Sequence, residues 1–181
     1  MDIRNSGKYI FLGGTRSGKS LVAEQAIASG HSEICYLATA PRAWALSDPD
    51  FAARVAGHQE RRGANWRSLE LDAAGDIYDL IENADIPTLV DSVGGWLAHD
   101  VDFVPDFIRL EQAIRRCSVP LSFVAEEAGL SVHPESKVAR RYVDLLGQAN
   151  QAISNCVDRV FFVAAGRAAE LFSPIYVGEG S

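Results

Sequence analysis

The sequence predicts an α/β domain whose mainly parallel sheet is flanked by helices, and three observations lead to this prediction. Short apolar runs alternate along the chain with longer segments of helical spacing. These runs lack a polar face, which is typical of strands that are buried on both sides. The first run leads into a glycine-rich loop that opens a helix, FLGGTRSGKS at residues 11–20.

The apolar runs and the helical segments follow one another along the chain. We expect strands at 9–12, 33–38, 88–91, 121–125 and 159–164, with an additional strand at 66–71. We expect helices over about 18–29, 49–62, 73–83, 105–117 and 136–155. A chain of 181 residues with 48% hydrophobic residues suits a single domain over 1–181.

The composition limits the kinds of binding partner and the cellular compartment that we expect for this chain. The formal charge is −7 and no basic stripe runs along the chain, so we do not expect nucleic-acid binding. The N-terminus is polar and no apolar run approaches the ~18 residues of a membrane span, which predicts a cytoplasmic protein without a stable membrane anchor. The three cysteines lack CxxC spacing, which favours buried thiols in a reducing compartment: Cys35, Cys117 and Cys156.

The glycine-rich loop fits the pattern GxxxxGK[ST] at every fixed position. Its glycines let the backbone wrap closely around phosphate oxygens, and the following helix adds its positive dipole end. Lys19 should reach the β and γ phosphates, and the Ser20 hydroxyl should hold Mg²⁺. Arg16 either braces a phosphate or pairs with an acid. The other nucleotide-binding residues expected here are Gly13, Gly14, Thr15, Ser17 and Gly18.

A second acidic element is expected at the end of a neighbouring buried strand. Asp91 closes the run TLVD, where a carboxylate can hold Mg²⁺ directly or through water. The alternative is an aspartate that only caps a loop.

The stretch RVAGHQERRGANW places His58 beside Arg61 and Arg62, at helical spacings that share one face. A neutral imidazole can attack phosphorus while guanidinium groups offset the charge on the oxygens. Attack at an α-phosphate would transfer a nucleotidyl group. The alternative is a solvated helix histidine, which is how we interpret the remaining histidines, His31, His99 and His133.

The three tryptophans are interpreted as packing residues rather than stacking platforms. They are Trp44, Trp66 and Trp96. Trp96 also follows Asp91 closely enough to line a pocket.

Seven segments together resemble the bifunctional adenosylcobinamide kinase and adenosylcobinamide-phosphate guanylyltransferase family of cobalamin biosynthesis. In chain order they are FLGGTRSGKS, YLATA, AARVAGHQERR, WRSLE, LVDSVGGWL, EAGLSVHP and ARRYVDLLGQANQ, within residues 9–166. The resemblance implies a three-layer RecA-like P-loop NTPase fold and a homotrimer whose site is shared between subunits.

The resemblance also implies the reaction. ATP or GTP phosphorylates the aminopropanol hydroxyl of adenosylcobinamide, and GMP is then transferred from GTP to that phosphate through a guanylylated histidine, which gives adenosylcobinamide-GDP. His58 matches this histidine, and Lys19 and Asp91 complete the expected catalytic set. The further positions that match nucleotide contacts are Gln59, Glu60, Arg61, Arg62, Ala38, Thr39, Ala40 and Glu70.

The chain departs from the family pattern where the cobinamide pocket is expected. Ser131 replaces the second glycine of EVGxG, and Val143 stands where an arginine usually precedes Asp144. The segment after Trp96 is short, and the tail 167–181 has no match. These differences concern the identity of the acceptor more than the nucleotide chemistry.

Two other functions fit the same residues. One is a P-loop kinase of another small hydroxyl compound, in which His58 is only a surface residue. The other is a noncatalytic GTP-binding module whose loops move on binding.

Overall fold

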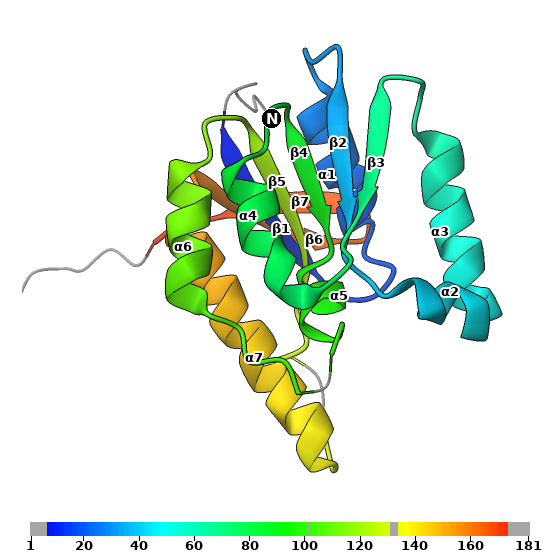
Figure 1. Cartoon of the computed structure of the whole chain (residues 1–181), viewed down its shortest axis with the longest axis vertical. Coiled ribbons are helices and arrows are strands. Elements are labelled where there is room, and N and C mark those ends of the chain that lie inside the picture. Colours follow the sequence, from blue (N-terminus) through cyan, green and yellow to red (C-terminus); the bar gives the residue numbers. More distant parts are fainter. Residues whose placement is uncertain (1–6, 101, 131–133, 174–181) are drawn as a thin grey trace, which may run out of the picture.

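The protein is built on one seven-stranded sheet in the order β3-β2-β4-β5-β1-β6-β7 (Figure 1). The structure is a computed structural model that describes residues 7–100, 102–130 and 134–173. Strands β1 to β6 pair in parallel, and β7 pairs antiparallel with β6. The strands are β1 (Lys8–Gly13), β2 (Ile34–Ala38), β3 (Trp66–Glu70), β4 (Thr88–Asp91), β5 (Leu121–Glu126), β6 (Arg159–Ala164) and β7 (Arg167–Leu171).

Helices cover both faces of the sheet, which confirms the predicted three-layer architecture. In Figure 1, α4, α6 and α7 lie in front of the sheet, α1 lies behind it, and α3 stands beside the β3 edge. The helices are α1 (Lys19–Ala28), α2 (Arg42–Ser47), α3 (Pro49–Arg61), α4 (Ile77–Glu82), α5 (Val93–Leu97), α6 (Phe107–Arg116) and α7 (Lys137–Ser154). All the expected strands and helices are present. No helix within the described ranges has both the length and the apolar character needed to cross a bilayer.

Two apolar cores lie on opposite faces of the sheet and explain the continuous apolar runs. In β1, Ile10 and Leu12 belong to the core under α4, α6 and α7, whereas Tyr9 and Phe11 belong to the core under α1. Successive side chains of a strand point to opposite faces, so a strand covered on both sides needs apolar residues at every position.

Side-chain caps define where four of the helices begin, and one of them is Ser92, which accepts from the Gly95 amide at the start of α5. Asp48 accepts hydrogen bonds from two backbone amides at the start of α3, Asp106 caps α6 and Ser136 caps α7. Helix α1 differs, because its N-cap residue is Gly18, which has no side chain to offer. The Lys19 amide makes a long contact of 3.4 Å with Ser17 Oγ, and the amides that follow it at the start of α1 remain available to a ligand.

Three elements were not expected from the sequence, namely α2, α5 and β7. Helix α5 contains two glycines, which disfavour helix by about 1 kcal/mol each. A Cβ at Gly94 would lie 2.3 Å from Glu126 Oε2, so close packing requires glycine there. Strand β7 forms the first part of the tail 167–181. Ser131, His133 and the tail end 174–181 lie outside the described residues.

The turn between β6 and β7 supports the glycine-rich loop. Ala165 and Gly166 both have positive φ, 51° and 72°, as two-residue hairpin turns require. The Gly166 amide donates to the Ser17 carbonyl at 2.7 Å. The hairpin therefore braces the loop from the side opposite to β5.

A pair of glycine substitutions tests this description of the turn. Gly166→Ala places a Cβ at positive φ and should destabilise the fold by about 1–2 kcal/mol. Gly147→Ala, at an exposed site within α7 where a Cβ meets open space, should stabilise it by about 0.5–1 kcal/mol. Urea unfolding measures both free energies. Changes of the same sign would contradict the assigned turn geometry.

Candidate active site

The carboxyl ends of the parallel strands open into a cleft of about 910 Å³. One wall is the glycine-rich loop with the start of α1, and the other is formed by α2 and α3. Among the described residues, the predicted site residues that line the cleft are Thr15, Arg16, Ser17, Gly18, Lys19, Ser20, Ala40, His58, Arg61 and Asp91. The loop, the histidine and the aspartate, far apart in the sequence, thus face one space.

The loop has the backbone of a phosphate cradle. Gly18 has φ of 91° and Arg16 has φ of 59°, so both residues are left-handed. A Cβ at Gly13 would lie 2.5 Å from the Val163 carbonyl oxygen, which excludes a larger residue. Lys19 Nζ donates to the Gly14 carbonyl at 3.3 Å, so the lysine lies across the loop.

Arg16 is exposed at the mouth of the cleft, where the sequence left two roles open. Within the described ranges no carboxylate forms an ion pair with its guanidinium. Its role stays a prediction.

Asp91 lies deep in the cleft, where polar side chains surround its carboxylate. The Ser20 hydroxyl hydrogen-bonds to it, and Tyr36 Oη donates to Oδ2 at 3.1 Å. Burial raises the pKa of Asp91, and the nearby Glu126 carboxylate raises it further, while His58 and the two hydrogen bonds lower it. The balance is a raised pKa, so the ionised carboxylate is incompletely compensated.

The oxygen atoms around Asp91 fit a magnesium ion. Ser20 and Asp91 are in contact and supply a hydroxyl and a carboxylate, which are the hard ligands that Mg²⁺ prefers. In the described part of the chain, no three His, Cys, Asp or Glu residues converge as an all-protein metal cage. Mg²⁺ suits such a sparse set, because it keeps several waters and binds substrate phosphates.

Glu126 is a cleft residue that the sequence analysis missed. It ends β5 beside Gly13 in register, and its Oε2 accepts from the Gly94 amide at 2.9 Å. Burial and the Glu126 carboxylate raise the pKa of Tyr142, also in the cleft, to about 12. Glu126 could have been found by the rule that identified Asp91, since it too closes a buried strand.

His58 projects from the last turn of α3 into the cleft. Its Nδ1 lies 3.1 Å from Glu24 Oε1 and 3.0 Å from Arg61 Nη2. Its side chain is 25% exposed and acts electrostatically on Asp91. His58 therefore lies in the cleft in contact with two charged side chains, and its role as a nucleophile stays a prediction.

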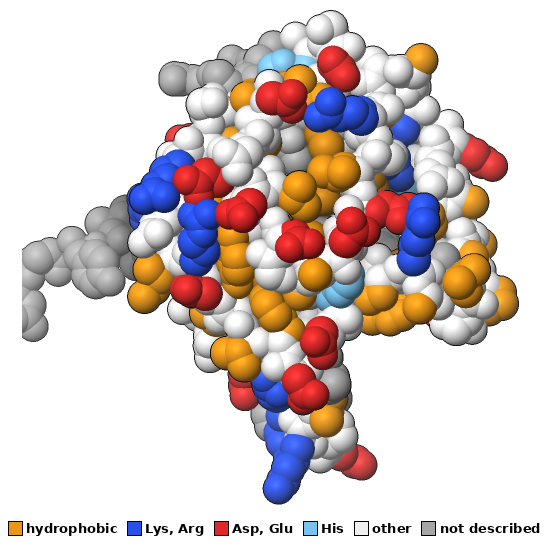
Figure 2. Space-filling model, in the orientation of Figure 1, with side chains coloured by type: hydrophobic (Ala, Val, Ile, Leu, Met, Phe, Trp, Pro, Cys, Tyr) orange, Lys and Arg blue, Asp and Glu red, His pale blue; other side chains and the backbone are white. Residues whose placement is uncertain are grey.

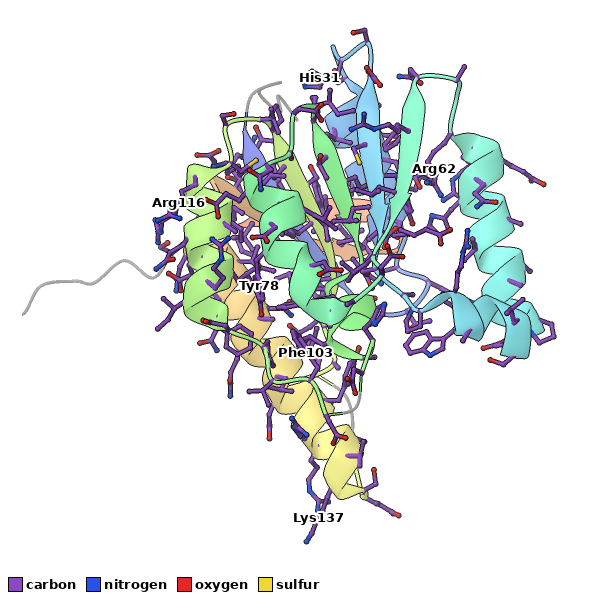
Figure 3. All side chains as sticks on the ribbon, viewed as in Figure 1. His31, Arg62, Tyr78, Phe103, Arg116 and Lys137 are labelled. Carbon is purple, nitrogen blue, oxygen red and sulfur yellow. The ribbon has the colours of Figure 1, made fainter. Side chains whose placement is uncertain are left out.

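Arg62 does not join Arg61 at the cleft, so the expected convergence of two guanidinium groups is wrong. Helix α3 ends at Arg61, and Arg62 has extended backbone, so helical spacing no longer applies to it. Its guanidinium lies 3.4 Å from the centre of the Tyr36 ring, and its Nε donates to the His58 carbonyl at 3.0 Å. Figure 3 shows Arg62 between α3 and the strands.

Several expected nucleotide contacts lie outside the cleft lining in the described structure. Ala38 and Glu70 are level with Asp91 across β2 and β3, but Glu70 pairs with Arg42, Oε2 to Nε at 2.5 Å. Thr39 is buried, and its hydroxyl bridges the amide and the carbonyl of Ser92. The other positions outside the lining are Gly13, Gly14, Gln59 and Glu60. Their roles stay predictions.

Trp96 and Trp44 lie in different environments, one in the core and the other at the cleft. Trp96 is 1% exposed and packs in the core, so it does not line the pocket. Trp44 does line it, with its ring centre 5.8 Å from that of Phe51. Figure 2 shows apolar side chains gathered over α2 and the adjoining end of α3, where Leu46 is 90% exposed.

The family of this chain follows from a sequence model of one protein family that matches most of the chain. The profile described as "Cobinamide kinase / cobinamide phosphate guanyltransferase" matches residues 9–171. The chain belongs to this family. It is therefore an enzyme of cobinamide phosphorylation and guanylyl transfer, and the resemblance noted in the sequence is confirmed.

Individual relatives agree with this assignment. The bifunctional adenosylcobalamin biosynthesis protein CobP of Pseudomonas aeruginosa is 37% identical over 87% of this chain and 92% of its own. The corresponding CobU of Salmonella typhimurium is 31% identical over 85% and 93%. The flagellar accessory protein FlaH of Methanocaldococcus jannaschii, 13% identical, covers 91% of this chain and 77% of its own with a TM-score of 0.54, which supports the fold alone.

Replacing Asp91 should increase the stability of the ligand-free protein. Because the folded pKa is raised, the folded state holds the proton more tightly, and stability falls as pH rises from about 3.9 through the folded pKa. Asp91→Asn removes this loss, so its melting temperature at about pH 7.5 should exceed that of wild type. Each kcal/mol gained corresponds to about 2–4 °C in a domain of this size.

The exposed Asp72 provides a control for Asp91→Asn. Asp72→Asn removes the same charge from the surface and should change stability by less than about 0.5 kcal/mol. A lower melting temperature for Asp91→Asn at neutral pH would show that the carboxylate stabilises the empty cleft.

Proposed function

We propose that this one cleft performs both steps of the family's reaction, with adenosylcobinamide and then its phosphate as acceptor. The observation that supports this is that the phosphate loop, Asp91 and His58 all face one space. ATP or GTP is the phosphoryl donor in the first step, and GTP is the guanylyl donor in the second.

In the first step the protein positions groups and neutralises charge. The loop amides and the uncapped start of α1 hold the phosphates, and Lys19 and Arg16 offset their charge. Lys19 must leave the Gly14 carbonyl to do so, and a single long, exposed hydrogen bond of 3.3 Å is a weak restraint. Ser20 and Asp91 would hold Mg²⁺, which would neutralise charge on the phosphate oxygens.

In the second step His58 is the nucleophile. The imidazole attacks the α-phosphorus of GTP, the bond to the bridging oxygen breaks, and pyrophosphate leaves. The acceptor phosphate then displaces the histidine from the guanylyl group, which frees the ring. Arg61 lies beside His58 in the cleft and would offset charge on the transferring phosphate.

The acceptor occupies the part of the cleft where this chain departs from the family pattern. Tyr142 lines this region from α7, next to Val143. The shortened segment after Trp96 packs Phe103 onto the Trp96 ring, with the ring centres 5.7 Å apart.

We also infer a cytoplasmic homotrimer, as the family resemblance implies. The apolar surface of α2, where Leu46 and Trp44 are exposed, lies beside the cleft and suits a subunit contact near the site. The two other functions considered, a kinase without guanylyl transfer and a noncatalytic GTP-binding module, are not favoured by the family assignment.

The two steps can be separated with GTP labelled at the α-phosphate. Wild type should form an acid-labile, base-stable adduct. His58→Ala should abolish it and slow guanylyl transfer by on the order of 10³-fold or more, while phosphorylation of adenosylcobinamide persists. Lys19→Ala should impair both steps, because both bind their donor in the same loop.

Three outcomes discriminate among the functions. Equal loss of both activities in a folded His58→Ala protein would contradict the assigned nucleophile. Phosphorylation by wild type without any adduct would indicate a kinase alone. GTP binding without turnover, even with adenosylcobinamide present, would indicate a binding module.

A further inference from the structure

A buried carboxylate on α1 makes its side-chain contacts with the proposed nucleophile and its neighbour. Glu24 is 5% exposed, and a buried charge requires partners. Its partners are His58, with Nδ1 3.1 Å from Oε1, and Arg61, with Nε 3.4 Å from Oε2. Both partners come from α3.

The helix that carries Glu24 also carries the phosphate loop residues. Glu24 lies four residues after Ser20 and five after Lys19 on α1. The contact with Glu24 therefore fixes the imidazole relative to the helix that binds the phosphates. Among the side chains that the structure describes, neither apolar core contains one from α2 or α3, so this polar contact and the Arg62 contacts contribute to the docking of α3.

The same contact decides which nitrogen of His58 can react. An ionised carboxylate only accepts hydrogen bonds, so Glu24 selects the tautomer with the proton on Nδ1. That tautomer leaves the lone pair on Nε2, and no described residue is hydrogen-bonded to Nε2. The unpartnered nitrogen is the one that can act as a nucleophile.

Arg61 competes for the same nitrogen. Its Nη2 lies 3.0 Å from Nδ1, and a guanidinium only donates, so this contact needs the proton on Nε2 instead. Nδ1 cannot satisfy both partners at once. The Arg61 side chain is 41% exposed and lines the cleft, so an incoming phosphate can draw it away, whereas the buried Glu24 stays in place.

We propose that Glu24 is a positioning residue that holds His58 as the Nδ1–H tautomer, and that nucleotide binding favours this tautomer by removing Arg61 from Nδ1. The inference rests on the proposed role of His58. Nε2 forms the bond to the α-phosphorus as pyrophosphate leaves with the electron pair of the broken P–O bond. The proton stays on Nδ1, and Glu24 stabilises the positive charge of the ring until the acceptor phosphate displaces Nε2.

Glu24→Gln tests this proposal, because an amide of the same size can donate to Nδ1 and permits the other tautomer. Multiple-bond ¹H–¹⁵N spectra report the tautomer, with His58 assigned from its absence in His58→Asn. With the α,β-methylene analogue of GTP, wild type should show Nδ1–H and Glu24→Gln should shift toward Nε2–H. The single-turnover rate of guanylylation should fall about 10- to 100-fold, as for comparable supporting residues, and fall at least tenfold more than phosphorylation.

Two further variants separate charge from structure. Glu24→Asp keeps the carboxylate and should retain the Nδ1–H tautomer with an intermediate rate. Glu33→Gln, at an exposed site before β2, should match wild type in both activities. If Glu24→Asp is guanylylated slowly and shows the Nε2–H tautomer expected for Glu24→Gln, the negative charge of Glu24 does not select the tautomer.

The failure of this inference is distinct from failure of the proposed function. If wild type forms no adduct from α-labelled GTP, the role of His58 fails. If wild type forms the adduct and Glu24→Gln does so at the same rate, only the role of Glu24 fails. Should Glu24→Gln not fold, an Nε2–H tautomer in analogue-bound wild type would by itself overturn the proposal.

Discussion

The site depends on one constraint, namely that six parallel strands all end at the same edge of the sheet. The backbone of β1 turns there into the phosphate loop, β4 ends at Asp91 and β5 ends at Glu126. The order of the sheet places β5 between β4 and β1, so both carboxylates stand beside the loop. Polar groups gather at this edge because helices cover both faces of the central strands, which leaves the strand ends as the open part of the sheet.

The two walls of the cleft, one formed by the phosphate loop with α1 and the other by α2 and α3, are held in place by different interactions. The sheet, α1 and the helices on the opposite face share two apolar cores. Among the described residues, the α2–α3 segment is outside those cores and contacts the body through polar side chains, namely Arg42, His58, Arg61 and Arg62. A segment held by a few partly exposed polar contacts has low local stability, which suits a wall that must admit a nucleotide and then a bulky acceptor.

Tyr36 connects the end of α3 to the strand end that carries Asp91, through its ring on one side and its hydroxyl on the other. Its ring lies under the Arg62 guanidinium, and its hydroxyl donates to Asp91. Burial and the charge of Asp91 hold the pKa of Tyr36 well above its usual range, so the phenol remains a donor. The end of α3 and the proposed magnesium ligand are thus joined by one rigid side chain.

The sequence by itself determined the α/β class, the order of the expected strands and helices, the phosphate loop and Asp91. These features follow from local patterns, since periodicity, glycine spacing and the end of an apolar run need no knowledge of distant contacts. The family pattern likewise singled out His58. Glu126 was equally accessible, because it ends β5 as Asp91 ends β4.

Only the tertiary structure decided which of these residues meet. Arg61 and Arg62 are adjacent in sequence but diverge, because α3 ends between them. Glu24 meets His58 only when α3 folds over α1. Trp96 packs in the core as expected, whereas Trp44 lines the cleft, because packing selects which ring is buried. Such contacts join residues far apart in the chain, and their geometry depends on the packing of whole elements rather than on any local pattern.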